Sequence, residues 1–141
     1  DVCQRRPRPA GRGGTVKPRR ESEIQRAILE HCNRLPGVVL WRVNSGAVTA
    51  TYKGKTRFVR FNGMPGMSDL YGFQTIHLGR VKDVGTEFTN SMIARSIAIE
   101  VKCPGQKPTP LQATFLDLVR KAGGLAIVAT SVDDVVNAGL R

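Results

Sequence analysis

The spacing of apolar residues along the chain predicts a helix and then strands in the first half of the sequence. Residues 21–35 (ESEIQRAILEHCNRL) place apolar side chains at helical spacing, and Pro36-Gly37 closes that helix. Residues 38–43 (VVLWRV) are rich in β-branched side chains and predict a strand, as do residues 69–76 (DLYGFQTI). We therefore expect a helix to pack on a sheet that contains these two strands.

A hairpin is predicted between these two strands. Residues 47–62 (AVTATYKGKTRFVRFN) read as two extended segments that turn at Lys53-Gly54, and a glycine-rich bend, NGMPGMS, follows them. Residues 77–95 keep no period, so we expect a long loop or an extra hairpin there.

The clearest helix signals lie in residues 109–124 (TPLQATFLDLVRKAGG). Thr109 is the expected N-cap, Pro110 occupies the first helical position, and Gln112 completes a capping box. Gly123 supplies the usual residue at the helix end.

Strands and helices alternate in the second half of the chain. Residues 96–102 (SIAIEVK) and 125–130 (LAIVAT) predict strands on either side of that helix, and residues 131–140 (SVDDVVNAGL) predict a short capped helix. A strand, helix, strand sequence requires a parallel crossover and helices on the faces of the sheet. The expected fold class is α/β, a small mixed sheet flanked by helices in the order αβββαβα.

Charge divides the chain into a tail and a domain. The 141 residues carry a formal net charge of +11. Residues 1–20 hold seven Lys or Arg and one Asp, which is +6, and residues 21–141 hold fifteen and ten, which is +5. The tail is rich in Arg, Pro and Gly, so we expect it to be disordered, either as a solvated leader or as a nucleic-acid-binding arm.

Neither a secretory leader nor a membrane-spanning run is visible in the sequence. The three cysteines, Cys3, Cys32 and Cys103, have no zinc-ligand spacing and are expected to be reduced thiols. We therefore expect a cytoplasmic, intracellular protein with no membrane partner.

Glu100 and Lys102 are the first candidates for chemistry. They lie two positions apart at the end of an apolar strand, so they point to the same face of the sheet. Burying either charge is costly without a partner, so they form either a structural ion pair or a site. Asp69 begins the preceding predicted core strand and is expected nearby.

Two carboxylates on adjacent strands repel each other unless a cation lies between them. Asp69, Glu100 and the main-chain carbonyl of Val101 would supply hard oxygen ligands, which suit Mg²⁺ or Mn²⁺. Lys102 beside such an ion would orient or deprotonate a water and offset charge on a phosphate, which describes phosphodiester hydrolysis.

Together these segments resemble the VRR-NUC domains, a branch of the PD-(D/E)xK nuclease superfamily with a restriction-endonuclease-like core. The resemblance covers residues 20–136 approximately and rests on ESEIQ at 21–25, GMSD at 66–69, EVK at 100–102 and Gln112. It implies a Mg²⁺- or Mn²⁺-dependent DNA endonuclease that leaves a 5′-phosphate. Branched DNA such as a Holliday junction is an implied substrate, and a homodimer is an implied assembly.

The resemblance assigns catalytic roles to five residues, which are Glu21, Asp69, Glu100, Lys102 and Gln112. Glu21 shares a helix face with Gln25, unless Ser22 and Gln25 form a capping box that leaves Glu21 just before the helix. Gln112 has a capping role on local grounds, and this role is compatible with one in the site.

Candidate DNA contacts lie in the first half of the chain. Asn44 and Ser45 resemble a family segment near the active site. The hairpin side chains of Lys53, Lys55, Arg57 and Arg60 would bind a phosphate backbone, although an ordinary solvated hairpin has the same composition.

Two other functions are compatible with the charge. The first is a non-catalytic basic nucleic-acid-binding module, in which Glu100 and Lys102 are a structural pair. The second is an RNA binder, which rests only on the basic composition and the Arg-rich tail.

Overall fold

The computed structural model describes residues 20–43, 47–60, 64–78, 81–83, 86–88 and 92–141. Residues 1–19 of the predicted tail lie outside this range. The elements are α1 (Glu21–Cys32), β1 (Val38–Arg42), β2 (Ala47–Tyr52), β3 (Lys55–Arg60), β4 (Leu70–His77), β5 (Val81–Asp83), β6 (Thr86–Phe88), β7 (Met92–Val101), α2 (Pro110–Lys121), β8 (Leu125–Ala129) and α3 (Val132–Asn137).

A mixed four-stranded sheet forms the centre of the fold. Its strand order is β1-β4-β7-β8, in which β4 pairs antiparallel with both β1 and β7, and β7 pairs parallel with β8. Two further hairpins, β2–β3 and β5–β6, form separate two-stranded sheets. The expected α/β class with a mixed sheet is therefore confirmed.

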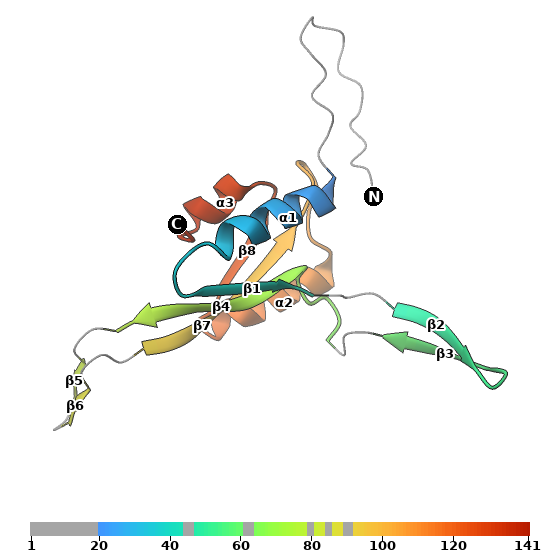
Figure 1. Ribbon diagram of the computed structural model, residues 1–141, viewed down its shortest axis with the longest axis horizontal. Helices are drawn as coiled ribbons and strands as arrows, with labels where there is room; N and C mark the ends of the chain where they lie inside the picture. The colour runs from blue at the N-terminus through green and yellow to red at the C-terminus, as the bar shows by residue number, and fades with distance from the viewer. Residues whose placement is uncertain (1–19, 44–46, 61–63, 79–80, 84–85, 89–91) are drawn as a thin grey trace, which may run out of the picture.

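Helices cover both faces of the sheet, with α1 and α3 on one side and α2 on the other (Figure 1). The larger core joins α1 and α3 to alternate residues of the strands, and Ile28, Leu70, Ile97 and Ile99 are fully buried in it. A second cluster packs Phe115, Leu116 and Val119 of α2 on Ala98. The neighbouring residues of β7 thus point into opposite cores, as the alternation of a strand requires.

The caps of α2 follow the sequence signals. The Gln112 amide nitrogen donates to Thr109 Oγ1 at 3.3 Å, and the Thr109 amide donates to Gln112 Oε1 at 2.8 Å. Pro110 is the first helical residue, and Gly123 follows the helix with φ of 83°. These predictions are confirmed.

Two boundaries differ from the sequence prediction. The first helix ends at Cys32 because the Asn33 side chain bonds the backbone of Leu40 in β1 through both its oxygen, at 2.8 Å, and its nitrogen, at 2.9 Å. Strand β7 begins at Met92, inside the region expected to be a loop or hairpin. Residues 92–95 are exposed or half-buried, so they lack the apolar alternation that marks a strand, yet they pair with β4.

The cysteine prediction is wrong in part. Cys32 is a buried free thiol, and burial raises its pKa to about 11. Cys103, in contrast, is disulfide-bonded. No helix in the part of the chain that the structure describes is long and apolar enough to cross a membrane.

Candidate active site

Glu100 and Lys102 lie where β7 ends. The Glu100 side chain is 0% exposed, and its Oε1 is 2.6 Å from Lys102 Nζ. Lys102 follows the strand, and its amide donates to the Ala129 carbonyl of β8 at 2.9 Å, which fixes the backbone at this position. The ammonium group is thus held beside a carboxylate that water does not reach.

Asp69 lies next to this pair because of the register between β4 and β7. The antiparallel ladder pairs Leu70 with Ile99, so its continuation places Asp69 opposite Glu100. The Val101 amide donates to Asp69 Oδ2 at 2.9 Å, which anchors this carboxylate across the two strands. The structure therefore brings together three residues that the sequence predicted as a site.

The first turn of α1 supplies the fourth residue. The helix begins at Glu21, and the Arg20 amide donates to Glu23 Oε2 at 3.1 Å, so Glu23 caps the helix and the proposed cap at Ser22 is wrong. Glu21 Oε1 is 3.8 Å from Lys102 Nζ. Of the first two acidic residues of the helix, Glu21 is therefore the one that faces the site.

The electrostatic environment perturbs both members of the pair. Burial, together with the nearby negative charges of Asp69 and Glu21, raises the pKa of Glu100 from 4.5 to about 7, although Lys102 partly offsets the rise. Burial lowers the pKa of Lys102, but the contacts with Glu100, Glu21 and Asp69 outweigh it and raise the pKa overall. The ammonium form of Lys102 is therefore favoured, whereas Glu100 carries its negative charge at a cost.

Asp69 and Glu100 would offer carboxylate oxygens to a hard divalent cation. Oε1 of Glu100 is paired with the Lys102 ammonium at 2.6 Å, whereas its Oε2 has no hydrogen-bond partner among the described residues. Buried carboxylate oxygens without such partners are rare, and a cation between Glu100 and Asp69 would supply the missing interaction. Among the described residues, no group of three or more His, Cys, Asp or Glu side chains is arranged to hold a metal, so backbone carbonyl or water oxygens would complete the ligand set.

Gln112 lies at the first turn of α2, where its side chain takes part in the capping box described above. Its capping role is therefore confirmed, and its catalytic role stays a prediction.

Gln25 is a polar residue of α1 that the sequence argument considered only as a motif residue and as a possible capping partner of Ser22. It is only 6% exposed, lies one turn after Glu21, and its Oε1 has no hydrogen-bond partner among the described residues. Its position four residues after Glu21 was the available signal, because such residues share a helix face.

The predicted DNA contacts fall into two groups. Lys53, Lys55 and Arg57 belong to the β2–β3 hairpin and are exposed, and Arg60 ends β3. Asn44 and Ser45 lie outside the described residues.

Comparisons with known proteins add no family to this description. A scan against protein-family models, a search of curated proteins and a search of solved structures each found no match to the chain.

Proposed function

We propose that the protein is a metal-dependent DNA endonuclease of the PD-(D/E)xK type, similar to the VRR-NUC domains. One observation carries the proposal: at the end of a central strand, the fully buried Glu100 lies opposite Asp69 with Oε1 2.6 Å from Lys102 Nζ, and its Oε2 has no hydrogen-bond partner among the described residues. The carboxyl ends of strands are where open α/β sheets place their ligands.

Asp69, Glu100 and the Val101 carbonyl would hold Mg²⁺ or Mn²⁺. When bound, such an ion lowers the pKa of a coordinated water and neutralises charge on a phosphate oxygen. Two features of the chain would favour binding of the ion: the Val101 amide holds Asp69 in place through a hydrogen bond, and Glu100 is buried from water.

Lys102 acts in this proposal as a cation rather than as a base. Its raised pKa keeps the proton on Nζ, so it donates to the attacking water or to a phosphate oxygen. Glu21 helps to hold the ammonium group in place from the other side. The capping box uses Oε1 of Gln112, so a contact with substrate would come from its Nε2.

The arrangement of elements is compatible with a restriction-endonuclease-like core. Without the two hairpins, the elements follow the order α1-β1-β4-β7-α2-β8-α3. Asp69 directly precedes β4, Glu100 lies in β7, and these two strands are neighbours in the sheet. This order supports the proposal together with the motifs at 21–25, 66–69 and 100–102. Branched DNA as substrate and a homodimer as assembly are parts of the same proposal.

A non-catalytic DNA-binding module is the alternative, and the exposed basic hairpin favours it. A magnesium-dependent nicking assay on plasmid and four-way-junction DNA distinguishes the two. We expect cleavage with Mg²⁺ or Mn²⁺ and a loss on the order of 10²- to 10³-fold in Lys102→Ala, with DNA binding retained.

The matched control is Glu30→Gln, since Glu30 is an exposed carboxylate near the other end of α1. This variant should cut like the wild type. Cleavage that persists in excess EDTA, or DNA that is bound and never cut under either metal, would overturn the nuclease proposal.

A further inference from the structure

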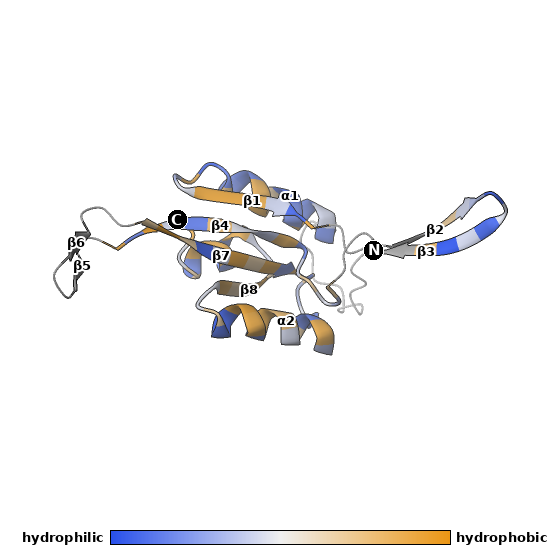
Figure 2. Ribbon diagram, turned by 90° about the horizontal axis from the view of Figure 1, so that it is seen from below, coloured by the Kyte–Doolittle hydropathy of each residue, from blue (hydrophilic) through white to orange (hydrophobic). Residues whose placement is uncertain are grey.

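The β2–β3 hairpin, residues 47–60 and called the β2–β3 arm below, projects away from the central sheet (Figures 1 and 2). Every side chain from residue 49 to residue 58 is exposed. Tyr52 is 75% and Phe58 66% exposed, so neither aromatic ring serves the core of the domain. A two-stranded hairpin without a packed face is only marginally stable, and packing therefore does not explain the arm.

The charge of the arm has one sign. Its ionisable residues besides Tyr52 are Lys53, Lys55, Arg57 and Arg60, and it contains no Asp or Glu. Lys53, Lys55 and Arg57 are exposed, and exposed cations without a compensating carboxylate attract a polyanion.

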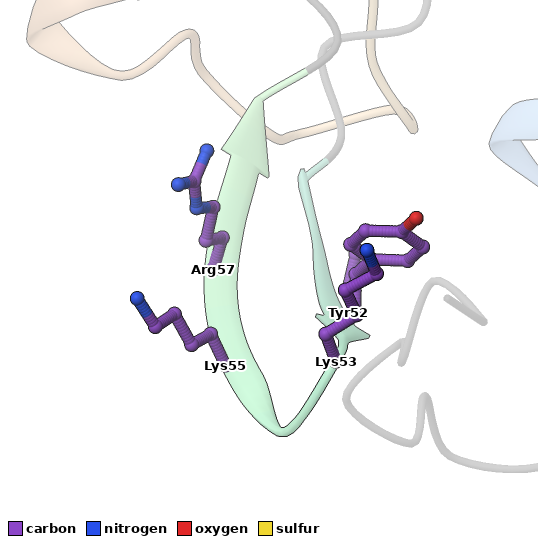
Figure 3. Close-up of a pocket in the computed structure, with 5 residues that line it drawn as sticks. Tyr52, Lys53, Lys55 and Arg57 are labelled. Atoms are coloured by element: carbon purple, nitrogen blue, oxygen red, sulfur yellow. The ribbon is translucent and has the colours of Figure 1, made fainter.

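One face of the arm is hollowed between its cations. The register pairs Tyr52 with Lys55 and Ala50 with Arg57, so these four side chains share a face. The small Ala50 leaves a concavity of about 460 Å³ that Tyr52, Lys53, Lys55 and Arg57 line. Lys55 and Arg57 extend side by side from β3 (Figure 3), and Lys53 Nζ is 5.5 Å from the centroid of the Tyr52 ring.

The turn keeps this face open. Lys53 and Gly54 have φ values of 48° and 73°, the combination of a two-residue type I′ turn. The sharp reversal places three cations and one aromatic ring at the outer end of the arm, where Figure 2 draws the turn and bands of β3 in blue.

Described residues that precede and follow the arm in the sequence contact Asp69 or α2. The Val43 amide, just before the arm, donates to the Asp69 carbonyl at 2.7 Å. On the return, Gly66 has φ of 76°, and a Cβ there would lie 2.4 Å from the Leu111 backbone, so the bend packs tightly on α2. Six residues in β2 give the arm a length of roughly 20 Å at about 3.4 Å per residue.

We infer that the β2–β3 arm binds the phosphate backbone of duplex DNA beside the bond that is cut. The inference rests on the proposed function, because that function places the cut bond at Asp69. Val43, four residues before the arm, donates a hydrogen bond to the Asp69 carbonyl. A two-stranded ribbon fits the B-form major groove, about 12 Å wide, whereas the major groove of A-form RNA is too deep and narrow for side chains to read. A length of roughly 20 Å corresponds to about six base pairs beyond the site.

The first test measures DNA affinity in EDTA, where no cleavage occurs. We compare Lys55→Gln/Arg57→Gln with the control Arg34→Gln/Lys121→Gln, which also removes two exposed cations, near the far ends of α1 and α2. The slope of log affinity against log salt concentration should become shallower by about 1.8 when two phosphate contacts are lost. At about 0.15 M salt, DNA binding should be roughly 30-fold weaker. Lys53→Asn, which keeps a residue suited to positive φ, should flatten the slope by about half as much.

The second test varies the nucleic acid and its length. The loss caused by the arm variant should be largest on duplex DNA and should disappear when the duplex is shortened from about 16 to about 4 base pairs. An equal or greater loss on single-stranded DNA or on duplex RNA would overturn the assignment to duplex DNA. If the arm variant and the control bind duplex DNA with equal affinity, the proposal that the arm contacts DNA is overturned.

These outcomes are separable from the failure of the proposed nuclease function. If the arm variant binds DNA poorly but neither the wild type nor any variant cleaves DNA, the nuclease proposal fails and the proposal that the arm binds DNA is retained. If Mg²⁺-dependent cleavage is present and equal in the arm variant and its control at limiting enzyme, the arm fails and the nuclease proposal stands.

Discussion

Replacing Glu100 with Gln distinguishes a catalytic carboxylate from a structural ion pair by the sign of a stability change. The native pKa of about 7 lies above the ordinary value of 4.5, so folding favours the protonated form. The stability that the neutral Glu100 carboxyl contributes is fully present below pH 4.5 and is lost as the pH rises through about 7. The difference of 2.5 (7 minus 4.5) corresponds to about 3 kcal/mol at about 1.36 kcal/mol per pKa unit.

Glu100→Gln should therefore stabilise the metal-free protein at pH 8, by up to about 3 kcal/mol, because the amide keeps the shape and removes the buried charge. The gain is smaller to the extent that Lys102 loses its partner at 2.6 Å, although Glu21 remains 3.8 Å from it. Near pH 4 the two proteins should unfold at similar denaturant concentrations.

The assay is urea unfolding at pH values of about 4, 6 and 8, with EDTA or with Mg²⁺. These pH values lie on both sides of the native pKa of Glu100. Magnesium should stabilise the wild type and have no effect on Glu100→Gln, since linkage requires a ligand that binds the native state. The Glu30→Gln variant, which removes an exposed carboxylate, should unfold like the wild type at each pH and should respond to Mg²⁺ as the wild type does.

A structural pair predicts the opposite result. Breaking a buried ion pair strands its partner at a cost of about 3 to 5 kcal/mol, so Glu100→Gln would then unfold more easily at pH 8. That outcome, or an equal response of both proteins to Mg²⁺, would refute the reasoning about this site.

Three further predictions concern the metal, the capping carboxylate of α3 and the bend before Asp69. Ca²⁺ should allow DNA binding without cleavage, because the oxygen ligands accept it in a longer and looser geometry; multiple turnover in Ca²⁺ would contradict the assigned ligands. Asp134→Ala should cost about 2 kcal/mol at pH 7, since Asp134 accepts hydrogen bonds from the Thr130 amide and hydroxyl and from the Ser131 amide. The hydrogen bonds from Thr130 lower the pKa of Asp134 despite its burial, so this difference in urea unfolding should be full above pH 4 and shrink below it; a difference that is constant down to pH 2 would exclude the carboxylate as its cause. Gly66→Ala should cost roughly 2 kcal/mol or more and reduce cleavage, as the left-handed φ and the Leu111 backbone oppose a Cβ; unchanged unfolding and activity would mean that the bend adapts freely.

Short-range features of this protein were predictable from the sequence. The capping box of Thr109 and Gln112 and the turn at Lys53-Gly54 involve residues at most three positions apart, so local hydrogen bonding and allowed φ values decide them. The alternation in residues 97–102 likewise placed Glu100 and Lys102 on one face without any knowledge of their neighbours.

The start of α1 shows the limit of this local reasoning. The sequence argument offered a capping box of Ser22 with Gln25, whereas the structure begins the helix at Glu21, and the Arg20 amide donates to Glu23 Oε2. The extension of β7 to Met92 was equally invisible, because its residues are exposed on the sheet and are held by pairing with β4 rather than by an apolar pattern.

The candidate site itself was decided by tertiary structure. Asp69 and Glu100 are 31 positions apart (100 minus 69), with the β5–β6 hairpin between them, and only the β4–β7 register places them opposite each other. The pKa of Glu100 depends on the burial that excludes water from it, on the contact with Lys102, and on the charges of Asp69, just before β4, and of Glu21 in α1. Spacing along a chain specifies which side chains share a face, whereas desolvation and charge proximity depend on which distant segments pack together.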